Sequence, residues 1–288
     1  MAGSSLLVRI RNRTARMRER RWRMARYRSI QRHIVMGGAP RSGTTLLRKL
    51  LDRHPLIRSG AETKLFVPAA YNLVWLSEAY AIPGDELRQM RRESPSQAAF
   101  VDAFADRVKV EAGKERWAEK TPQNIRNLDW ILERFPRASV VHIIRDGRDV
   151  VCSMRQHPDW RWLDGGWQKV LVPRSIESYT RRWLADTATG MAWREDPRYV
   201  EVRYEDLVAD PEVVMRAICD GVGAPADTDW LATFARRDES RDQDGRPDYE
   251  GAVSGASVGR WREDLSAAER LEVERLCGPR LRELGYEV

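Results

Sequence analysis

Residues 33–54 read HIVMGGAPRSGTTLLRKLLDRH, and this stretch decides the fold. The apolar residues 33–37 predict a short strand, and the leucines of 46–51 recur at helical spacing in a helix that starts near Thr44. Residues 37–45, GGAPRSGTT, form the loop between the two elements. Such a loop suits a phosphate or sulfate group, because its backbone N–H groups and the N-terminus of the helix can all bind one anion.

The loop departs from the nucleoside-triphosphate pattern GxxxxGK[ST] at one position. Gly38 and Gly43 occupy the two glycine positions of that pattern. Thr45 occupies the hydroxyl position, but Thr44 stands where the pattern has lysine. The ammonium group that reaches the β- and γ-phosphates is therefore missing, while Arg41 offers a guanidinium from inside the loop. We expect the loop to bind a different anion.

The rest of the chain alternates between strand-like and helix-like segments. Residues 138–145, ASVVHIIR, are apolar on both faces, which is typical of a parallel strand buried between helices. Residues 198–207 alternate like a strand. Helical spacing follows in 121–135, where Thr121 is the expected N-cap, and in 174–193. We predict a P-loop-like three-layer α/β fold, with a central, mainly parallel sheet flanked by helices.

The N-terminal arm differs from the rest of the sequence in charge. The 288-residue chain has a net charge of +7, but residues 9–32 hold 11 arginines and a single acid, so the remainder carries a net charge of −3. We therefore predict an arginine-rich arm or helix over 1–32 and a single domain over 33–288, whose surface does not suit nucleic acid. The arm is expected to be a solvated or partly disordered helix; the alternative is docking on an acidic partner or, in a homodimer, on a second copy.

Cysteine spacing and hydropathy indicate the compartment. Cys152, Cys219 and Cys277 are far apart and without metal-ligand spacing, which favours buried thiols in a reducing environment and no metal. No apolar run approaches the length of a membrane span, and the N-terminus has no apolar core typical of a signal peptide. We expect a cytoplasmic protein.

Two motifs resemble those of sulfotransferases that use 3′-phosphoadenosine 5′-phosphosulfate (PAPS). Residues 39–45, APRSGTT, look like the 5′-phosphosulfate loop of this family, and residues 140–154, VVHIIRDGRDVVCSM, look like its 3′-phosphate motif. Further stretches are similar to the tyrosylprotein sulfotransferase branch and its bacterial relatives. They are LLDRHPLIRSGAETK (50–64), EKTPQN (119–124), VRYEDLV (202–208), VGRWREDLS (258–266) and LRELGYE (281–287).

The resemblance implies a set of nucleotide-binding residues. The 5′-phosphosulfate would be bound by Arg41, Ser42, Gly43, Thr44 and Thr45. The 3′-phosphate would be bound by Arg145 and by Ser153, which is eight residues further along. Tyr204, Arg260 and Trp261 match further nucleotide contacts, whereas the family serine that precedes Trp261 is either Ser254 or Ser257.

The resemblance also implies the catalytic groups. Glu62 falls on the catalytic carboxylate of the tyrosylprotein branch and Lys120 on its catalytic lysine. Glu62 would remove the proton of the acceptor, while Lys120 and Arg41 would neutralise charge on the departing oxygen without a metal. The acceptor is expected to present a hydroxyl, or less favourably an amine, on a small molecule, a glycan or a peptide. The tryptophans of 157–172, an expected insertion, are either core residues or part of the acceptor pocket: Trp160, Trp162 and Trp167.

Each assignment has a structural alternative. Arg145 could form a surface ion pair with Asp146 or Asp149, and Glu62 could cap a helix or pair with Lys64. Lys120 could be a solvated lysine, and His142 is expected to be a buried core histidine.

Two other functions are compatible with the sequence. A small-molecule kinase using ATP and magnesium would need Asp146 or Asp149 as a metal ligand. A binding protein without enzymatic activity would act through its arginine-rich arm, on nucleic acid or on another partner.

Overall fold

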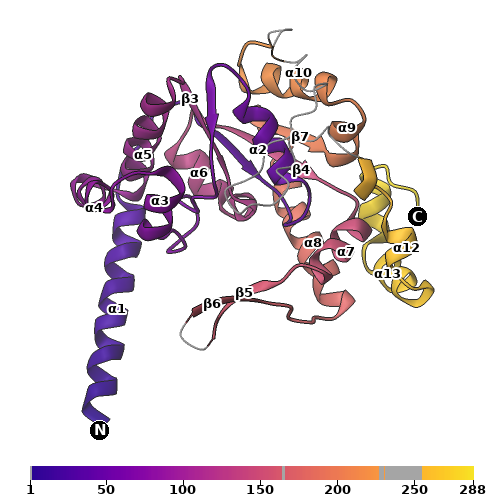
Figure 1. Ribbon diagram of the computed structural model, residues 1–288, viewed down its shortest axis with the longest axis horizontal. Helices are drawn as coiled ribbons and strands as arrows, with labels where there is room; N and C mark the ends of the chain where they lie inside the picture. Colours follow the sequence, from indigo (N-terminus) through magenta and orange to yellow (C-terminus); the bar gives the residue numbers. More distant parts are fainter. Residues whose placement is uncertain (1, 164–165, 227–229, 231–254) are drawn as a thin grey trace.

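A computed structural model describes residues 2–163, 166–226, 230 and 255–288 (Figure 1). At its centre is a parallel five-stranded sheet in the order β2-β3-β1-β4-β7. Its strands are β1 (Ile34–Gly37), β2 (Ile57–Ser59), β3 (Arg116–Lys120), β4 (Ser139–Ile144) and β7 (Tyr199–Arg203). The predicted strands at 33–37 and 138–145 are confirmed as the neighbouring strands β1 and β4, so the two motif loops that follow them emerge at the same edge of the sheet.

Helices cover both faces of this sheet, as the sequence predicts. Successive strand residues point to opposite faces, so Val35 packs into one core and its neighbours Ile34 and Met36 pack into the other. The Val35 core is covered by α3 (Leu73–Tyr80), α4 (Gly84–Glu93), α5 (Gln97–Ala112) and α6 (Leu128–Arg134). The opposite core is covered by α2 (Thr44–Asp52), α9 (Tyr204–Ala209) and α10 (Pro211–Val222). The three-layer α/β fold is confirmed.

A third apolar cluster lies at the side of the sheet. It joins α7 (Gly147–Arg155), α8 (Ile176–Met191) and the C-terminal α13 (Ala267–Glu283), which lie side by side in Figure 1. Ser266 and Glu269 have the spacing of a capping box in the sequence, and this box is present at the start of α13, each side chain bonded to the other residue's backbone N–H. Ahead of α13 come the short helices η3 (Gly255–Ser257) and α12 (Trp261–Asp264). These C-terminal elements therefore lie beside α7, which carries Ser153.

One predicted boundary is confirmed and one is wrong. Thr121 is the N-cap residue, as predicted, but the helix that it precedes is the 3₁₀ helix η1 (Pro122–Asn127), and its hydroxyl donates to Glu119 rather than accepting from the helix N-terminus. The strand predicted over 198–207 ends at Arg203, because Tyr204 and Leu207 lie one helical turn apart and pack into the core from α9.

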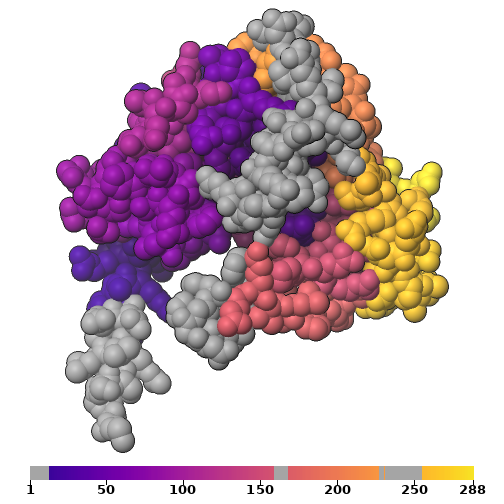
Figure 2. Space-filling model, in the orientation of Figure 1, coloured from indigo at the N-terminus to yellow at the C-terminus, as the bar shows by residue number. Residues whose placement is uncertain are grey.

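The arginine-rich arm is a helix whose C-terminal end docks on the body of the same chain. α1 (Ala2–Met24) extends away from the sheet in Figure 1, and Figure 2 shows its described end against the neighbouring residues. Trp22 Nε1 donates to Ser94 O at 2.9 Å, and Arg23 donates to Phe66 O at 3.0 Å. The expectation of a purely solvated arm is therefore wrong for this end.

The remaining segments complete the description. Residues 157–172, expected as an insertion, contain an antiparallel hairpin of β5 (Asp159–Leu163) and β6 (Gly166–Val170). Residues 236–251, whose polar, charged and glycine-containing sequence predicts a loop, lie outside the described residues. All three cysteines are buried, as expected. Within the described part of the chain, we find no helix with the length and hydropathy required to cross a bilayer.

Candidate active site

The loop after β1 has the backbone geometry of an anion cradle. Helix α2 begins at Thr44, and its N-cap Gly43 has a left-handed backbone (φ 95°) with no side-chain cap. A Cβ at Gly43 would overlap the ring of Tyr204. Glycine is thus required both by the backbone angle and by the tyrosine packed on it. The first N–H groups of α2 have no partner within the helix, which leaves them to bind an anion.

The structure brings the two predicted nucleotide motifs into direct contact. Arg41 Nε, in the loop after β1, donates to Ser153 Oγ on α7 at 3.0 Å. Arg145, at the end of β4, donates through Nη1 to Arg41 O at 3.3 Å. The Arg145 guanidinium also lies over the Tyr204 ring, 4.6 Å from its centroid. Four residues predicted from three separate stretches of the sequence therefore form one cluster.

Two buried polar atoms of this cluster have no hydrogen-bond partner within the described protein. They are Ser42 Oγ and Arg145 Nε, on residues that are 0% and 5% exposed. Both atoms can donate a hydrogen bond, so they suit the oxygens of an anionic group. Thr44 is likewise buried, while Arg41 and Thr45 are exposed. These donors fit a phosphorylated or sulfated nucleotide bound between the two motifs.

Of the two candidate serines, Ser254 and Ser257, the structure describes only Ser257. Ser257 Oγ lies 2.9 Å from Tyr204 OH, and Ser257 O accepts a hydrogen bond from Arg145. Ser254 lies outside the described residues. Ser257 thus belongs to the cluster of Arg41, Arg145 and Tyr204. The sequence alone could not say whether Ser254 or Ser257 matches the family serine.

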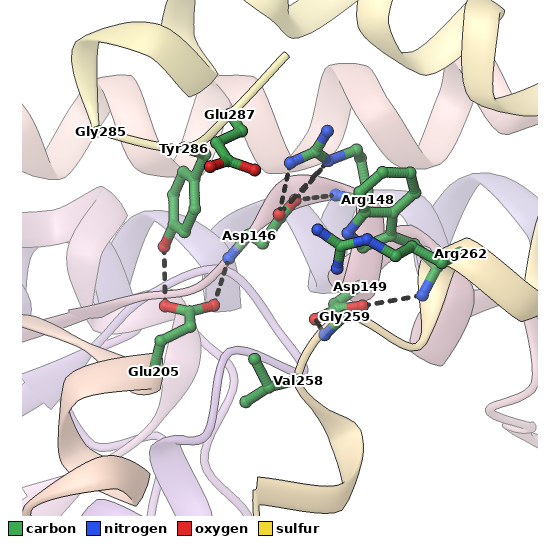
Figure 3. A pocket seen from close by; sticks show the side chains of 11 residues that line it. Asp146, Arg148, Asp149, Glu205, Val258, Gly259, Arg262, Gly285, Tyr286 and Glu287 are labelled. Carbon is green, nitrogen blue, oxygen red and sulfur yellow. Dashed lines mark hydrogen bonds and ion pairs between the residues drawn. The ribbon is translucent and has the colours of Figure 1, made fainter.

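Asp149 holds the segment after Ser257 in place. Figure 3 shows its carboxylate among the residues of a pocket beside α7 and α12. Asp149 Oδ2 accepts from Gly259 N at 2.8 Å, and Oδ1 accepts from Trp261 N at 3.0 Å. Burial raises the pKa of this carboxyl, while the two backbone donors and Arg145 oppose that shift. The alternative that Arg145 merely forms a surface ion pair is wrong, because Arg145 and Asp149 are both buried.

Asp146 also binds groups of the protein. Its side chain accepts from Arg148 N at 2.9 Å and so caps α7, and it forms an ion pair with the Arg148 guanidinium at 2.8 Å. In the same pocket, Glu205 accepts hydrogen bonds from Asp146 N and from Tyr286 OH, each at 2.9 Å (Figure 3). Of the two aspartates named as metal ligands for a kinase, Asp146 thus orders the turn between β4 and α7, and Asp149 orders the segment after Ser257.

Arg260 and Trp261 lie next to the cluster, but their side chains bind other residues. Arg260 donates to Asp264 at 2.6 Å and to Gln156 at 2.7 Å. The Trp261 ring stacks under the Arg148 guanidinium, with 3.9 Å from the guanidinium carbon to the ring centroid. Their assignment as nucleotide contacts stays a prediction. The structure does not describe the side chains of Trp160, Trp162 and Trp167, so their placement in the core or in an acceptor pocket stays a prediction.

The two predicted catalytic residues form an ion pair. Lys120 Nζ lies 2.5 Å from Glu62 Oε1, although 58 residues separate them in sequence. The Lys120 side chain is 6% exposed and that of Glu62 is 35% exposed, so the carboxylate faces solvent while the lysine is enclosed. A solvated Lys120 and a Glu62–Lys64 pair are therefore both wrong. Trp75, itself 46% exposed on α3, donates from Nε1 to Glu62 O at 2.8 Å.

Sequence reasoning missed Glu119, the residue before Lys120. Its side chain is buried and accepts hydrogen bonds from Thr63, Thr121 and Asn124. The available signal was a glutamate at the start of the quoted motif EKTPQN, directly before the predicted catalytic Lys120, because a carboxylate buried at this position requires several donors. Thr121 and Asn124 lie in the same quoted motif, EKTPQN, but Thr63 could be located only in the folded chain.

Comparisons with known proteins identify the family and the fold of this chain. A family model described as "Sulfotransferase family" matches residues 33–229. Protein-tyrosine sulfotransferase A of Caenorhabditis elegans is 28% identical over 205 residues, which cover 67% of this chain and 50% of that protein. Nodulation protein NoeE of Sinorhizobium fredii is 28% identical over 283 residues, 87% of this chain and 65% of that protein. The chain spans about half the length of the protein-tyrosine sulfotransferases that it matches first.

Solved structures share the fold. The sulfotransferase domain from the Synechococcus olefin synthase superposes with a TM-score of 0.60 at 22% identity, covering 93% of this chain and 99% of that one. Mouse sulfotransferase SULT7A1 was solved in complex with 3′-phosphoadenosine 5′-phosphate (PAP). It superposes with a TM-score of 0.56 at 13% identity, covering 89% of this chain and 86% of that one. At these identities the likeness concerns the fold alone.

Proposed function

The chain belongs to the sulfotransferase family, and from this premise we propose that it transfers a sulfuryl group from PAPS to an acceptor hydroxyl. The observation that carries the proposal is the contact between Arg41 and Ser153, which joins the phosphosulfate loop to the 3′-phosphate motif. One nucleotide that carries an anionic group at each end of its ribose would bind both motifs at once. A nucleoside triphosphate would leave the 3′-phosphate motif without a ligand.

Each end of the donor has its own group of residues. The backbone N–H groups at the start of α2, with Ser42 Oγ, would bind the 5′-phosphosulfate. Arg145 and Ser153 would bind the 3′-phosphate, and Tyr204 holds the Arg145 guanidinium in place by stacking. Arg41 and Arg145 supply the positive charge of these two groups. Both side chains are already ordered, because Arg145 donates to Arg41 O and Arg41 donates to Ser153 in the motif that contains Arg145.

The Glu62–Lys120 pair supplies the reactive groups. Glu62 takes the proton from the acceptor hydroxyl as its oxygen forms a bond to sulfur, and the bond between sulfur and the nucleotide phosphate oxygen breaks. The departing oxygen gains negative charge, which Lys120 and Arg41 would offset. Lys120 suits this role because it is enclosed at the end of β3. An enclosed ammonium interacts more strongly with developing charge than a solvated one does.

The acceptor is proposed to be a small molecule, a glycan or a peptide. The protein-tyrosine sulfotransferases among the relatives support a peptide acceptor, since they are named for a tyrosine in a protein. Beside Glu62, the exposed ring of Trp75 offers an apolar surface that a phenolic or sugar ring can contact.

Calorimetry and a transfer assay test the proposal. We expect 3′-phosphoadenosine 5′-phosphate (PAP) to bind the folded chain in buffer with EDTA, and ATP with magnesium to bind far more weakly. Sulfur-35-labelled PAPS should then label at least one member of a panel of tyrosine peptides, oligosaccharides and phenols. A folded chain with no affinity for PAP, or with a clear preference for ATP and magnesium, would refute the proposed function.

A further inference from the structure

We propose that Glu119 is a positioning residue that sets the geometry of the Glu62–Lys120 pair. This inference rests on the proposed function, because it assigns a role in sulfuryl transfer. Glu119 directly precedes Lys120 at the end of β3, and it binds Thr63, the residue that directly follows Glu62. One buried carboxylate is therefore adjacent to both proposed catalytic residues.

The Glu119 carboxylate joins three separate segments. Its Oε1 accepts from Thr63 N at 3.1 Å, Thr63 Oγ1 at 2.8 Å and Thr121 Oγ1 at 2.7 Å. Its Oε2 accepts from Asn124 Nδ2, which also donates to Met36 O at the end of β1. The segment after β2, the end of β3 and the strand that leads into the phosphosulfate loop thus share one anchor.

This anchor fixes three consecutive backbone N–H groups after Glu62. Thr63 N donates to Glu119 directly. Lys64 N donates to Thr121 Oγ1, and Leu65 N donates to Thr63 Oγ1, each at 3.2 Å, while both hydroxyls donate to Glu119. Lys64 has a left-handed backbone (φ 57°), which is unfavourable for a residue other than glycine. The hydrogen bonds to Glu119 stabilise the turn by which Glu62 reaches Lys120.

Glu119 and Lys120 point in different directions, which gives Glu119 a positioning role and Lys120 a catalytic one. Adjacent strand residues point to opposite faces, so Glu119 points into the protein while Lys120 points toward Glu62. Glu119 is 1% exposed, and every group bonded to it is a donor, as an ionised carboxylate requires. Burial nevertheless raises the pKa of this carboxyl. A charged group in such a location is retained only when its hydrogen bonds are complete.

The test compares Glu119→Ala with a matched buried carboxylate elsewhere in the chain. Asp102 is 6% exposed and accepts from Tyr27 OH, Ser29 Oγ and His33 Nε2, so in the described part of the chain its hydrogen bonds go to residues outside the proposed active site. Using the acceptor that the panel identifies, we expect Glu119→Ala to lower kcat about 100-fold with the Kd for PAP changed less than about threefold. Asp102→Ala should leave kcat within about threefold while the protein is folded. Glu119→Gln, which keeps one acceptor oxygen, should restore kcat to about a tenth of wild type.

A double-mutant cycle provides a readout that a general loss of stability would not alter. If Glu119 acts through Glu62, adding Glu119→Ala to a Glu62→Gln variant should lower the residual kcat by less than about threefold. Multiplied losses, or equal effects of Glu119→Ala and Asp102→Ala on kcat, would overturn the inference and leave the proposed function intact. If the wild-type chain bound no PAP, the proposed function would fail instead. Crystals of Glu119→Ala would then still test positioning: a Glu62–Lys120 pair unchanged in length would contradict it.

Discussion

Lys120 Nζ contacts Glu62 Oε1 at 2.5 Å, and the two side chains reach this contact from the end of β3 and from the segment that follows β2. The pairing places a carboxylate that can accept a proton beside an ammonium that can neutralise a departing oxygen. In the proposed mechanism these two groups act on different atoms of one reaction, and a separation of one hydrogen bond is compatible with this.

Removing the charge of Glu62 should separate catalysis from nucleotide binding. Glu62→Gln keeps the size of the side chain but cannot take up a proton, so kcat should fall about 100- to 1,000-fold. The Kd for PAP, measured by calorimetry, should remain within about threefold of wild type because Glu62 is outside the Arg41–Arg145 cluster. Turnover near the wild-type rate would remove Glu62 from the mechanism.

Arg145→Lys should weaken recognition of the 3′-phosphate selectively. Lysine retains the charge but loses the planar fork of donors and the stacking on Tyr204. We expect the Kd for PAP to rise about 10- to 100-fold, which corresponds to the loss of one or two charge-assisted hydrogen bonds. Adenosine 5′-phosphate, which lacks the 3′-phosphate, is the matched ligand, and its Kd should barely change. Equal losses for the two nucleotides would place the 3′-phosphate elsewhere.

Gly43→Ala should lower the free energy of unfolding by more than the left-handed backbone of Gly43 alone explains. Gly113 has a similar left-handed backbone (φ 63°) at the end of α5, and no atom lies within 4 Å of a Cβ placed there. Gly113→Ala should therefore lower the free energy of unfolding by about 1 to 2 kcal/mol, the cost of the left-handed conformation. Gly43→Ala should exceed that value in urea denaturation and also weaken PAP binding, because its methyl group would overlap Tyr204. Equal losses of stability and unchanged PAP binding would contradict this packing argument.

His142 should make the protein sensitive to acid. Burial lowers the pKa of this histidine from 6.5 to about 4, with Glu201 acting in the opposite direction, and its Nδ1 is hydrogen bonded to Tyr199 OH at 2.5 Å. The unfolded chain therefore binds a proton at a higher pH than the folded chain does. The stabilisation is complete above pH 6.5 and is lost as the pH falls toward 4, by up to about 3 kcal/mol.

The pH dependence of unfolding in urea checks this expectation. His142→Asn can keep a polar group near the Nδ1 position but does not titrate, so its free energy of unfolding should change less between pH 6.5 and pH 4 than that of wild type. The exposed His157 is the control, and His157→Asn should keep the wild-type curve. A His142→Asn curve parallel to wild type would show that other groups cause the loss.

The sequence by itself determined the layers of the fold and the nature of the loop. The apolar runs of β1 and β4 could be buried only between helices, because neither face of these strands is polar. Gly43 and the missing lysine at Thr44 identified an anion loop distinct from that of kinases, since these features depend on residues adjacent in the chain. For the same reason, the capping box of α13 was predicted correctly.

Only the tertiary structure decided which polar residues meet. Lys120 pairs with Glu62 rather than with solvent, and Ser257 reaches Tyr204, because parallel strands bring loops that are distant in sequence to one edge of the sheet. For the buried Glu119, the local sequence offered only the donors of its own motif, Thr121 and Asn124, because Thr63 comes from the segment after β2. Local patterns specify elements through neighbouring residues, whereas hydrogen bonds between loops depend on distances that only the folded chain defines.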